Sequence, residues 1–370
     1  MKKRSGLIKS GGMLSLICLS LFQGKVSGYD INDKLSIGGV LAGAYQYQWT
    51  DGDDDQGGGA VPFQPDFSFR PTEKDEIFAK FGFAAGNGLN GVTAFNLAPW
   101  AADLEDDVKD INGSNRDFLL TAWYEHEFEF SEKHSLGLTG GIIDATQYID
   151  ENAYANCQYT QFMNQALVNG PNSFAPSYDI GGAVDWEIGD WTITGVGMNV
   201  SENDEGENYN FFGAQIEYEV DTSLGEGHYR LIIEATSNDF LNNEGEEESR
   251  GAVFLSFDQE LGEIFGVWIR FGWQDDKAII DYDDLYSGGV NITGKWYGRE
   301  EDNIGIGYAY LGGDHVSDIE DTQVAEIYWR LVLNDYFALT ADLQYMKDEY
   351  ITEADDVKGF ILGLRGVVEF

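Results

Sequence analysis

Short segments in which apolar and polar residues alternate recur along most of this chain, and they restrict its possible folds more than any other feature. Each segment is roughly 10 residues long, aromatic residues are frequent at its ends, and turn-forming residues separate it from the next. We count sixteen segments, an even number. They are residues 35–48, 62–70, 76–85, 117–130, 134–147, 178–188, 191–200, 209–220, 228–237, 250–259, 264–273, 286–296, 303–311, 323–333, 336–346 and 358–370.

The connections between these segments alternate in length. Those after odd-numbered segments are long and acidic, such as residues 50–61 and 148–177, whereas those after even-numbered segments are short, such as residues 189–190. A soluble β-sandwich has no reason to sort its loops in this way. Outer-membrane barrels do, with long loops outside and short turns and both termini in the periplasm. The sequence therefore predicts an all-β fold, a transmembrane antiparallel β-barrel of about 16 strands.

The first 28 residues differ from the rest. Lys2, Lys3 and Arg4 precede an apolar run over residues 13–22, and small residues follow it, as in a secretory signal peptide. We predict a signal peptide over residues 1–28 and a single outer-membrane β-barrel domain over residues 29–370. The leader contains five of the 22 lysines and arginines and none of the 65 acidic residues, so the mature chain has a formal charge of about −48.

The period of two assigns each strand side chain to one of two faces. In residues 264–273, the apolar Ile269 and Phe271 share one face. Trp268 and Arg270 share the other. A charge facing lipid costs several kcal/mol near the midplane, so the apolar face meets lipid and the polar face lines the pore. The side chains that we predict on the pore wall are Glu217, Arg230, Glu234, Trp268, Arg270, Lys295, Glu326, Tyr328, Arg330, Asp342 and Arg365.

Two interpretations of this wall remain open, and both can hold together. Opposite charges on neighbouring strands can pair simply to stabilise the wall. Alternatively, arginines and carboxylates form a polar constriction that binds hydroxyl groups, while Trp268 or Tyr328 stacks on the apolar face of a sugar ring.

Residues 141–178 are too long and polar for a hairpin turn. In their middle, Phe162, Ala166 and Leu167 share one face of an expected short helix. We predict a partly helical constriction loop that folds into the lumen and packs on the inner wall through Phe162 and Leu167; a surface loop is the alternative. The side chains that we expect to face the passage and meet arginines of the later strands are Asp150, Asn152, Asn156 and Gln161.

The same insertion carries a family resemblance. Its residues Asp144-Ala145-Thr146, Asp150, Asn152, Ala155-Asn156, Thr160-Gln161-Phe162-Met163-Asn164 and Pro176 resemble the hallmark segment of the carbohydrate-selective porin family OprB. The end of the chain, from Glu326-Ile327-Tyr328 through Leu343-Gln344-Tyr345 and Gly363-Leu364-Arg365 to Phe370, is similar to that family's last strands. The resemblance implies a sixteen-stranded porin in the bacterial outer membrane that passes sugars by diffusion.

Other classes of protein fit poorly. The chain has no nucleophile elbow, phosphate loop or His-x-x-x-His pair, so we predict no enzyme activity, no catalytic residues, no cofactor and no metal site. Its acidity argues against nucleic acid as a partner.

We expect contact with outer-membrane lipids, small carbohydrates or ions as permeants, and recognition of the C-terminal strand by the barrel-assembly machinery; a homo-oligomer stays open. The alternative function is a general cation-preferring porin without sugar selectivity, as the net charge suggests.

Overall fold

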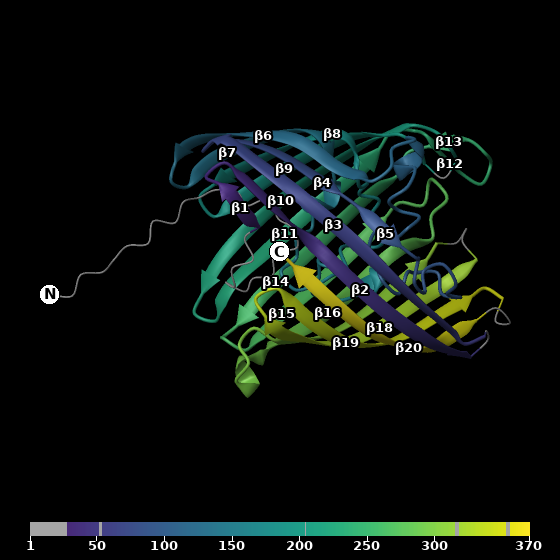
Figure 1. Cartoon of the computed structure of the whole chain (residues 1–370). Coiled ribbons are helices and arrows are strands. Elements are labelled where there is room, and N and C mark those ends of the chain that lie inside the picture. The colour runs from purple at the N-terminus through teal and green to yellow at the C-terminus, as the bar shows by residue number, and fades with distance from the viewer. Residues whose placement is uncertain (1–27, 52–53, 204, 315–317, 353–355) are drawn as a thin grey trace.

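The computed structural model describes residues 28–51, 54–203, 205–314, 318–352 and 356–370. The expected leader therefore lies outside the described residues, apart from its last position. The extended segments form one closed antiparallel barrel of 16 strands, in which β4 and β5 together make one strand (Figure 1). In chain order these are β2 (Leu35–Asp51), β3 (Gln56–Thr72), β4 (Asp75–Phe81) with β5 (Phe83–Ala85), β6 (Leu119–Ser131), β7 (His134–Ile143), β8 (Asp179–Ile188), β9 (Trp191–Val200), β10 (Tyr209–Thr222), β11 (Gly225–Thr236), β14 (Gly251–Leu261), β15 (Phe265–Gln274), β16 (Tyr282–Thr293), β17 (Asn303–Gly313), β18 (Ile319–Asn334), β19 (Phe337–Tyr350) and β20 (Val357–Glu369).

The remaining elements are short. A strand β1 (Tyr29–Asn32) folds back on β2, and β12 (Phe240–Leu241) pairs with β13 (Glu247–Glu248) within a loop. Four 3-10 turns complete the described chain: η1 (Ile111–Gly113), η2 (Ala145–Gln147), η3 (Gln165–Leu167) and η4 (Gly294–Tyr297). No helix among the described residues is long and apolar enough to cross a membrane.

The two faces of each strand follow the alternation in the sequence. On β15, Ile269 is 44% exposed on the outside of the barrel, whereas its neighbours Trp268 and Arg270 are each 1% exposed on the inside. Alternate apolar residues of β18 and β20 are exposed in the same way. On these strands the apolar residues lie outside and the polar ones inside, as the alternation predicts, and an apolar outer band is what a bilayer requires.

The barrel closes where β20 lies beside β2 (Figure 1). Gly39 and Phe370 each donate a backbone hydrogen bond to the other's carbonyl oxygen, at 3.0 and 3.2 Å. Gly39 has a φ of +145°, and a Cβ there would lie 2.4 Å from the carbonyl oxygen of Gln64, so only glycine fits this bend. The ring of Phe370 stacks on that of Phe63 at 6.2 Å. The last residue therefore joins the two ends of the sheet.

We expect deletion of Phe370 to lower the amount of inserted barrel severalfold. The deletion removes both hydrogen bonds to Gly39 and the ring contact with Phe63, beside the seam where β20 pairs with β2. The measurement is the heat-modifiable form of the protein in the membrane fraction, with Phe360→Ala on the same outer face as the control. Equal amounts of folded barrel with and without Phe370 would contradict this prediction.

Two long loops fold into the barrel. The first inner loop, residues 86–118, joins β5 to β6, and the second inner loop, residues 144–178, joins β7 to β8. We had expected only the second inside. The first buries a set of apolar side chains that could not face water without cost. This set is Leu89, Phe95, Leu97, Trp100, Leu104, Val108 and Ile111.

The inner loops are bonded to each other. The backbone N–H of Ala101 donates to the carbonyl of Met163 at 2.8 Å, and that of Gln165 donates to the carbonyl of Ala98 at 3.0 Å. The indole N–H of Trp100 donates to the carbonyl of Gln158 at 2.9 Å. Instead of the expected helix, the second loop contains single 3-10 turns, of which η3 is capped by the Asn164 side chain. The two loops therefore form one inner layer.

Candidate functional site: the passage through the lumen

The apolar face of the second inner loop packs on the later strands. The Phe162 ring lies edge-on to Trp268 at 5.6 Å and to Tyr328 at 5.0 Å, and Leu167 is fully buried in the same cluster. The predicted packing through Phe162 and Leu167 is thus confirmed. Trp268 and Tyr328 are each only 1% exposed because Phe162 covers them. The prediction that one of them stacks on a sugar ring was wrong.

Buried polar groups of the wall fix the loop backbone. The Glu326 carboxylate on β18 accepts from the N–H groups of Met163 at 2.7 Å and Asn164 at 2.9 Å. Arg365 on β20 donates to the carbonyls of Gln158 at 2.7 Å and Gln161 at 2.9 Å. These groups lie under the loop and anchor it.

Further members of the predicted wall support these anchors. The Gln344 amide donates to Asp342 at 2.8 Å and accepts from the side chain of Asn164 at 2.9 Å, so that Asp342 supports the loop through Gln344. Glu234 accepts from the hydroxyl of Ser173 at 2.8 Å, near the end of the second inner loop. The lumen wall therefore holds the loop at several points along its length.

The loop residues expected to face the passage mostly face the wall instead. Asp150 forms an ion pair with Arg270 at 2.8 Å, and Asn152 donates to the Ser256 hydroxyl at 3.3 Å. The Gln161 amide is used within the loop, where it donates to the carbonyl of Ala153 and accepts from the two N–H groups that follow Ala155. The predicted meeting of Asp150 with an arginine of a later strand is present, but it serves as an anchor. Of the four predicted residues, only Asn156 lines the open passage.

The other predicted wall residues pair with one another. Arg230 on β11 binds Glu217 at 2.6 Å and also binds Asp258 on β14. Arg330 binds Glu369 at 2.9 Å.

Lys295 corrects the sequence interpretation. The strand expected over residues 286–296 ends at Thr293, and Lys295 lies in turn η4, exposed and paired with Glu263. The prediction that it lines the pore was wrong, because the chain turns two residues before it.

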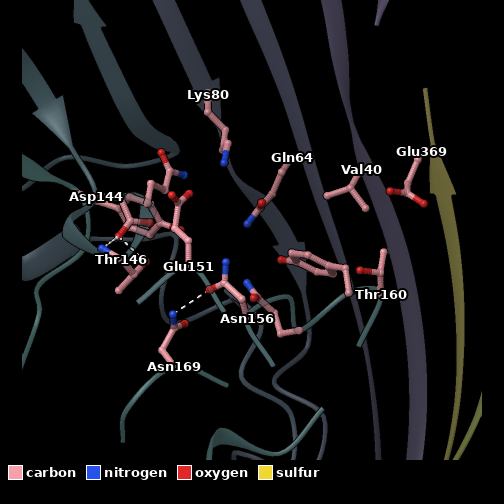
Figure 2. Close-up of a pocket in the computed structure, with 14 residues that line it drawn as sticks. Val40, Gln64, Lys80, Asp144, Thr146, Glu151, Asn156, Thr160, Asn169 and Glu369 are labelled. Carbon is pink, nitrogen blue, oxygen red and sulfur yellow. Dashed lines mark hydrogen bonds between the residues drawn. The ribbon is translucent and has the colours of Figure 1, made fainter. Parts of the chain in front are cut away.

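A pocket lies on the opposite side, against the early strands, and we call it the passage. It is a space of about 70 Å³ between the inner loops and the wall (Figure 2). The wall contributes Gln64 from β3, Lys80 from β4 and Glu369 from β20. The second inner loop contributes mainly polar groups, namely Asp144, Thr146, Gln147, Glu151, Asn156, Gln158, Tyr159, Thr160, Asn169 and Tyr178.

Sequence reasoning missed Lys80 and Glu151, although the alternation in residues 76–85 already placed Lys80 on the inner face. Two acids of the second inner loop, the half-buried Glu151 and the buried Asp144, have raised pKa values. Burial is the first cause in each case: it raises the pKa of Glu151 to about 8 and raises the pKa of Asp144. Hydrogen bonds from Thr146 and Ser177 to Asp144 act in the opposite direction. The Glu151 carboxyl group is thus more readily protonated than that of an exposed glutamate, and in the protonated form it both donates and accepts. Among the described residues, no group of three or more His, Cys, Asp or Glu side chains could hold a metal ion.

A closed antiparallel barrel of 16 strands with loops folded into its lumen defines a porin. The family model described as "Carbohydrate-selective porin, OprB family" matches residues 76–370. The chain therefore belongs to the OprB family, and it is an outer-membrane channel for the diffusion of carbohydrates. This family and fold are those of channels rather than of enzymes.

The chain is also similar to individual proteins. An uncharacterized protein of Aquifex aeolicus is 31% identical over 300 residues, which cover 79% of this chain and 82% of that protein. The high-pH structure of Pseudomonas putida OprB superimposes with a TM-score of 0.71 at 13% identity, covering 91% of this chain and 94% of that one. An anion-selective porin from Comamonas acidovorans gives a TM-score of 0.55 at 12% identity, covering 91% and 99%. At these identities the two structures show a shared fold alone.

Proposed function

We propose that carbohydrates and other small polar solutes cross the barrel through the passage between the inner loops and strands β2 to β4. The proposal rests on a difference between the two sides of the lumen: polar groups are bonded to protein on one side and line the passage on the other. On the later strands, Arg270, Arg330 and Arg365 are engaged by the loop or the wall. Beside the early strands, amide, hydroxyl and carboxyl groups line an open space. Such groups exchange hydrogen bonds with a sugar as water does, which lets it shed its hydration shell at low cost.

The proposed setting is the bacterial outer membrane. The exposed apolar band of the barrel would contact lipid, residues 1–28 would direct export and be removed, and β20 would be recognised by the barrel-assembly machinery. The barrel supplies the fold, and the inner layer of loops sets the width and chemistry of the passage.

Conductance in planar bilayers tests the proposed function. We expect a stable single-channel current that falls in a saturable way as neutral sugars are titrated in, because a sugar held in the passage excludes ions. Ordinary osmolytes of similar size that carry few hydroxyl groups serve as the control. A current that responds identically to sugars and to these osmolytes would refute sugar selectivity.

A general cation-preferring porin is the second candidate, and the mature charge of about −48 favours it, since 65 acidic residues face 17 basic ones once residues 1–28 are removed. Acidic groups raise the local concentration of cations, whereas neutral sugars respond to hydrogen bonds. A channel with cation preference but no saturable sugar block would be this second class.

We predict a preference for cations over anions at low salt in either case. Carboxylates outnumber basic groups on the exposed loops, and Glu127 and Glu129 lie near the β6–β7 turn. The preference should fade as the Debye length falls from ~30 Å at 0.01 M to ~3 Å at 1 M. The measurement is the reversal potential under a salt gradient, and an anion-selective reversal potential at low salt would be the contrary result.

A further inference from the structure

Lys80 differs from every other basic residue in the described part of the chain. It is the one lysine or arginine there for which the structure shows neither a hydrogen bond nor an ion pair within 4.0 Å. Its side chain is nevertheless only 8% exposed. Figure 2 shows it extending from β4 into the passage, toward Gln64 and Glu151.

A buried ammonium without partners is costly unless water or a ligand binds it. Asp66 is its direct neighbour across the β3–β4 pair, yet the two side chains form no ion pair. The carboxyl groups of Asp66, Asp103 and Asp144 are near enough to interact with Lys80 electrostatically. No protein acceptor occupies the three N–H donors of the ammonium.

Glu151 is the complementary group. It lines the same passage from the second inner loop, and the described structure shows no hydrogen bond or ion pair for it. Next to it, the amide of Asn156 accepts from that of Asn169 at 2.7 Å, which fixes that part of the lining. The Lys80 ammonium can donate hydrogen bonds to a ring hydroxyl, and the Glu151 carboxyl group can accept them. The two groups together suit a sugar ring, because each hydroxyl both accepts and donates.

We propose that Lys80 and Glu151 form a two-point binding site for one hydroxylated ring of a neutral sugar as it passes. This inference rests on the proposed function. It adds which residues bind the solute and that neutral sugars are preferred over charged ones. Sugars with a carboxylate or phosphate group are disfavoured because Lys80 is the one basic residue that lines the passage, and Asp144, Glu151 and Glu369 line it too. Lys80 therefore keeps its donors for hydroxyl groups.

The test compares sugar block of the current in the full-length channel and its variants. Lys80→Met removes the ammonium at nearly constant length, Lys80→Gln keeps a neutral donor, and Glu151→Met removes both carboxyl oxygens. Lys109→Met is the matched control, because Lys109 is exposed on the first inner loop and pairs with Glu105. Heat-modifiability of each variant verifies that the barrel is folded. The probes are neutral mono- and disaccharides and the corresponding sugar acids.

We expect the half-blocking concentration of neutral sugar to rise about 10-fold to 100-fold in Lys80→Met, the range expected for a hydrogen bond from a charged donor. Lys80→Gln should lose less, and Glu151→Met should also weaken the block. Lys109→Met and the current without sugar should stay near wild type. Unchanged block in both Lys80 variants, or tighter block by sugar acids than by neutral sugars in the wild type, overturns the site. Absence of any sugar block in the wild type overturns the proposed function itself.

Discussion

Replacement of residues 156–172 of the second inner loop by a Gly-Ser linker should raise the single-channel conductance by about twofold or more and abolish block by added sugar. The replaced segment contains Phe162 and Leu167, which pack on the wall, and Asn156, which lines the passage. Without it, ions follow a wider path and a sugar no longer touches both sides at once. The wall anchors Glu326 and Arg365 would then be hydrated in the open lumen, so the barrel itself should still fold.

The first inner loop limits the expected rise in single-channel conductance. It loses its hydrogen bonds to Met163 and Gln165 and the side chains of the second loop that share its apolar clusters, but its own residues remain between the walls, so part of the lumen stays filled. A Gly-Ser replacement of the exposed residues 243–246 is the matched control and should leave the conductance unchanged. Normal insertion with unchanged conductance and unchanged sugar block would show that the second loop does not line the conducting path.

Glu326→Ala should loosen the second inner loop without removing it. The carboxylate is 2% exposed and accepts two backbone N–H groups, at 2.7 and 2.9 Å. A typical hydrogen bond contributes a net ~0.5–1.5 kcal/mol. Because two such bonds are lost and water can replace the acceptor once the loop opens, we expect the closed loop to be destabilised by about 1.5 kcal/mol, which corresponds to about 10-fold more frequent loop opening.

The predicted readouts are current flicker and faster cleavage of the loop by an added protease, with little change in the amount of folded barrel. Glu320→Ala is the control, because Glu320 lies exposed on the same strand. In the protein with residues 156–172 already replaced, Glu326→Ala should add nothing. Equal flicker and cleavage rates in Glu326→Ala and Glu320→Ala would show that the anchor is unimportant.

The sequence was sufficient for the barrel because the responsible features are local. Alternation with a period of two puts Ile269 outside and Arg270 inside whatever the neighbouring strands do, since the bilayer penalises a polar outer face. The lengths of the connections likewise order the strands around the barrel. The main local error, at Lys295, arose because the end of a strand depends on a turn that alternation does not mark.

The sequence also contained an unread signal in the first inner loop. Leu97, Trp100 and Leu104 are apolar residues in a connection that was expected to be solvated, and such residues need a surface to cover them. The lumen provides that surface, together with the second loop. Recognition of this pattern would have placed both loops inside.

By itself, then, the sequence determined the strand order, the lipid-facing and lumen-facing sets, the acidic character and the family resemblance. Only the tertiary structure decided which lumen residues are open to a solute. Arg270 and Lys80 have the same alternation pattern, yet Arg270 is bound by Asp150, 120 positions earlier, while Lys80 faces the passage. That difference depends on which wall the inner loops cover. Packing between residues far apart in the chain makes this choice, so no local pattern encodes it.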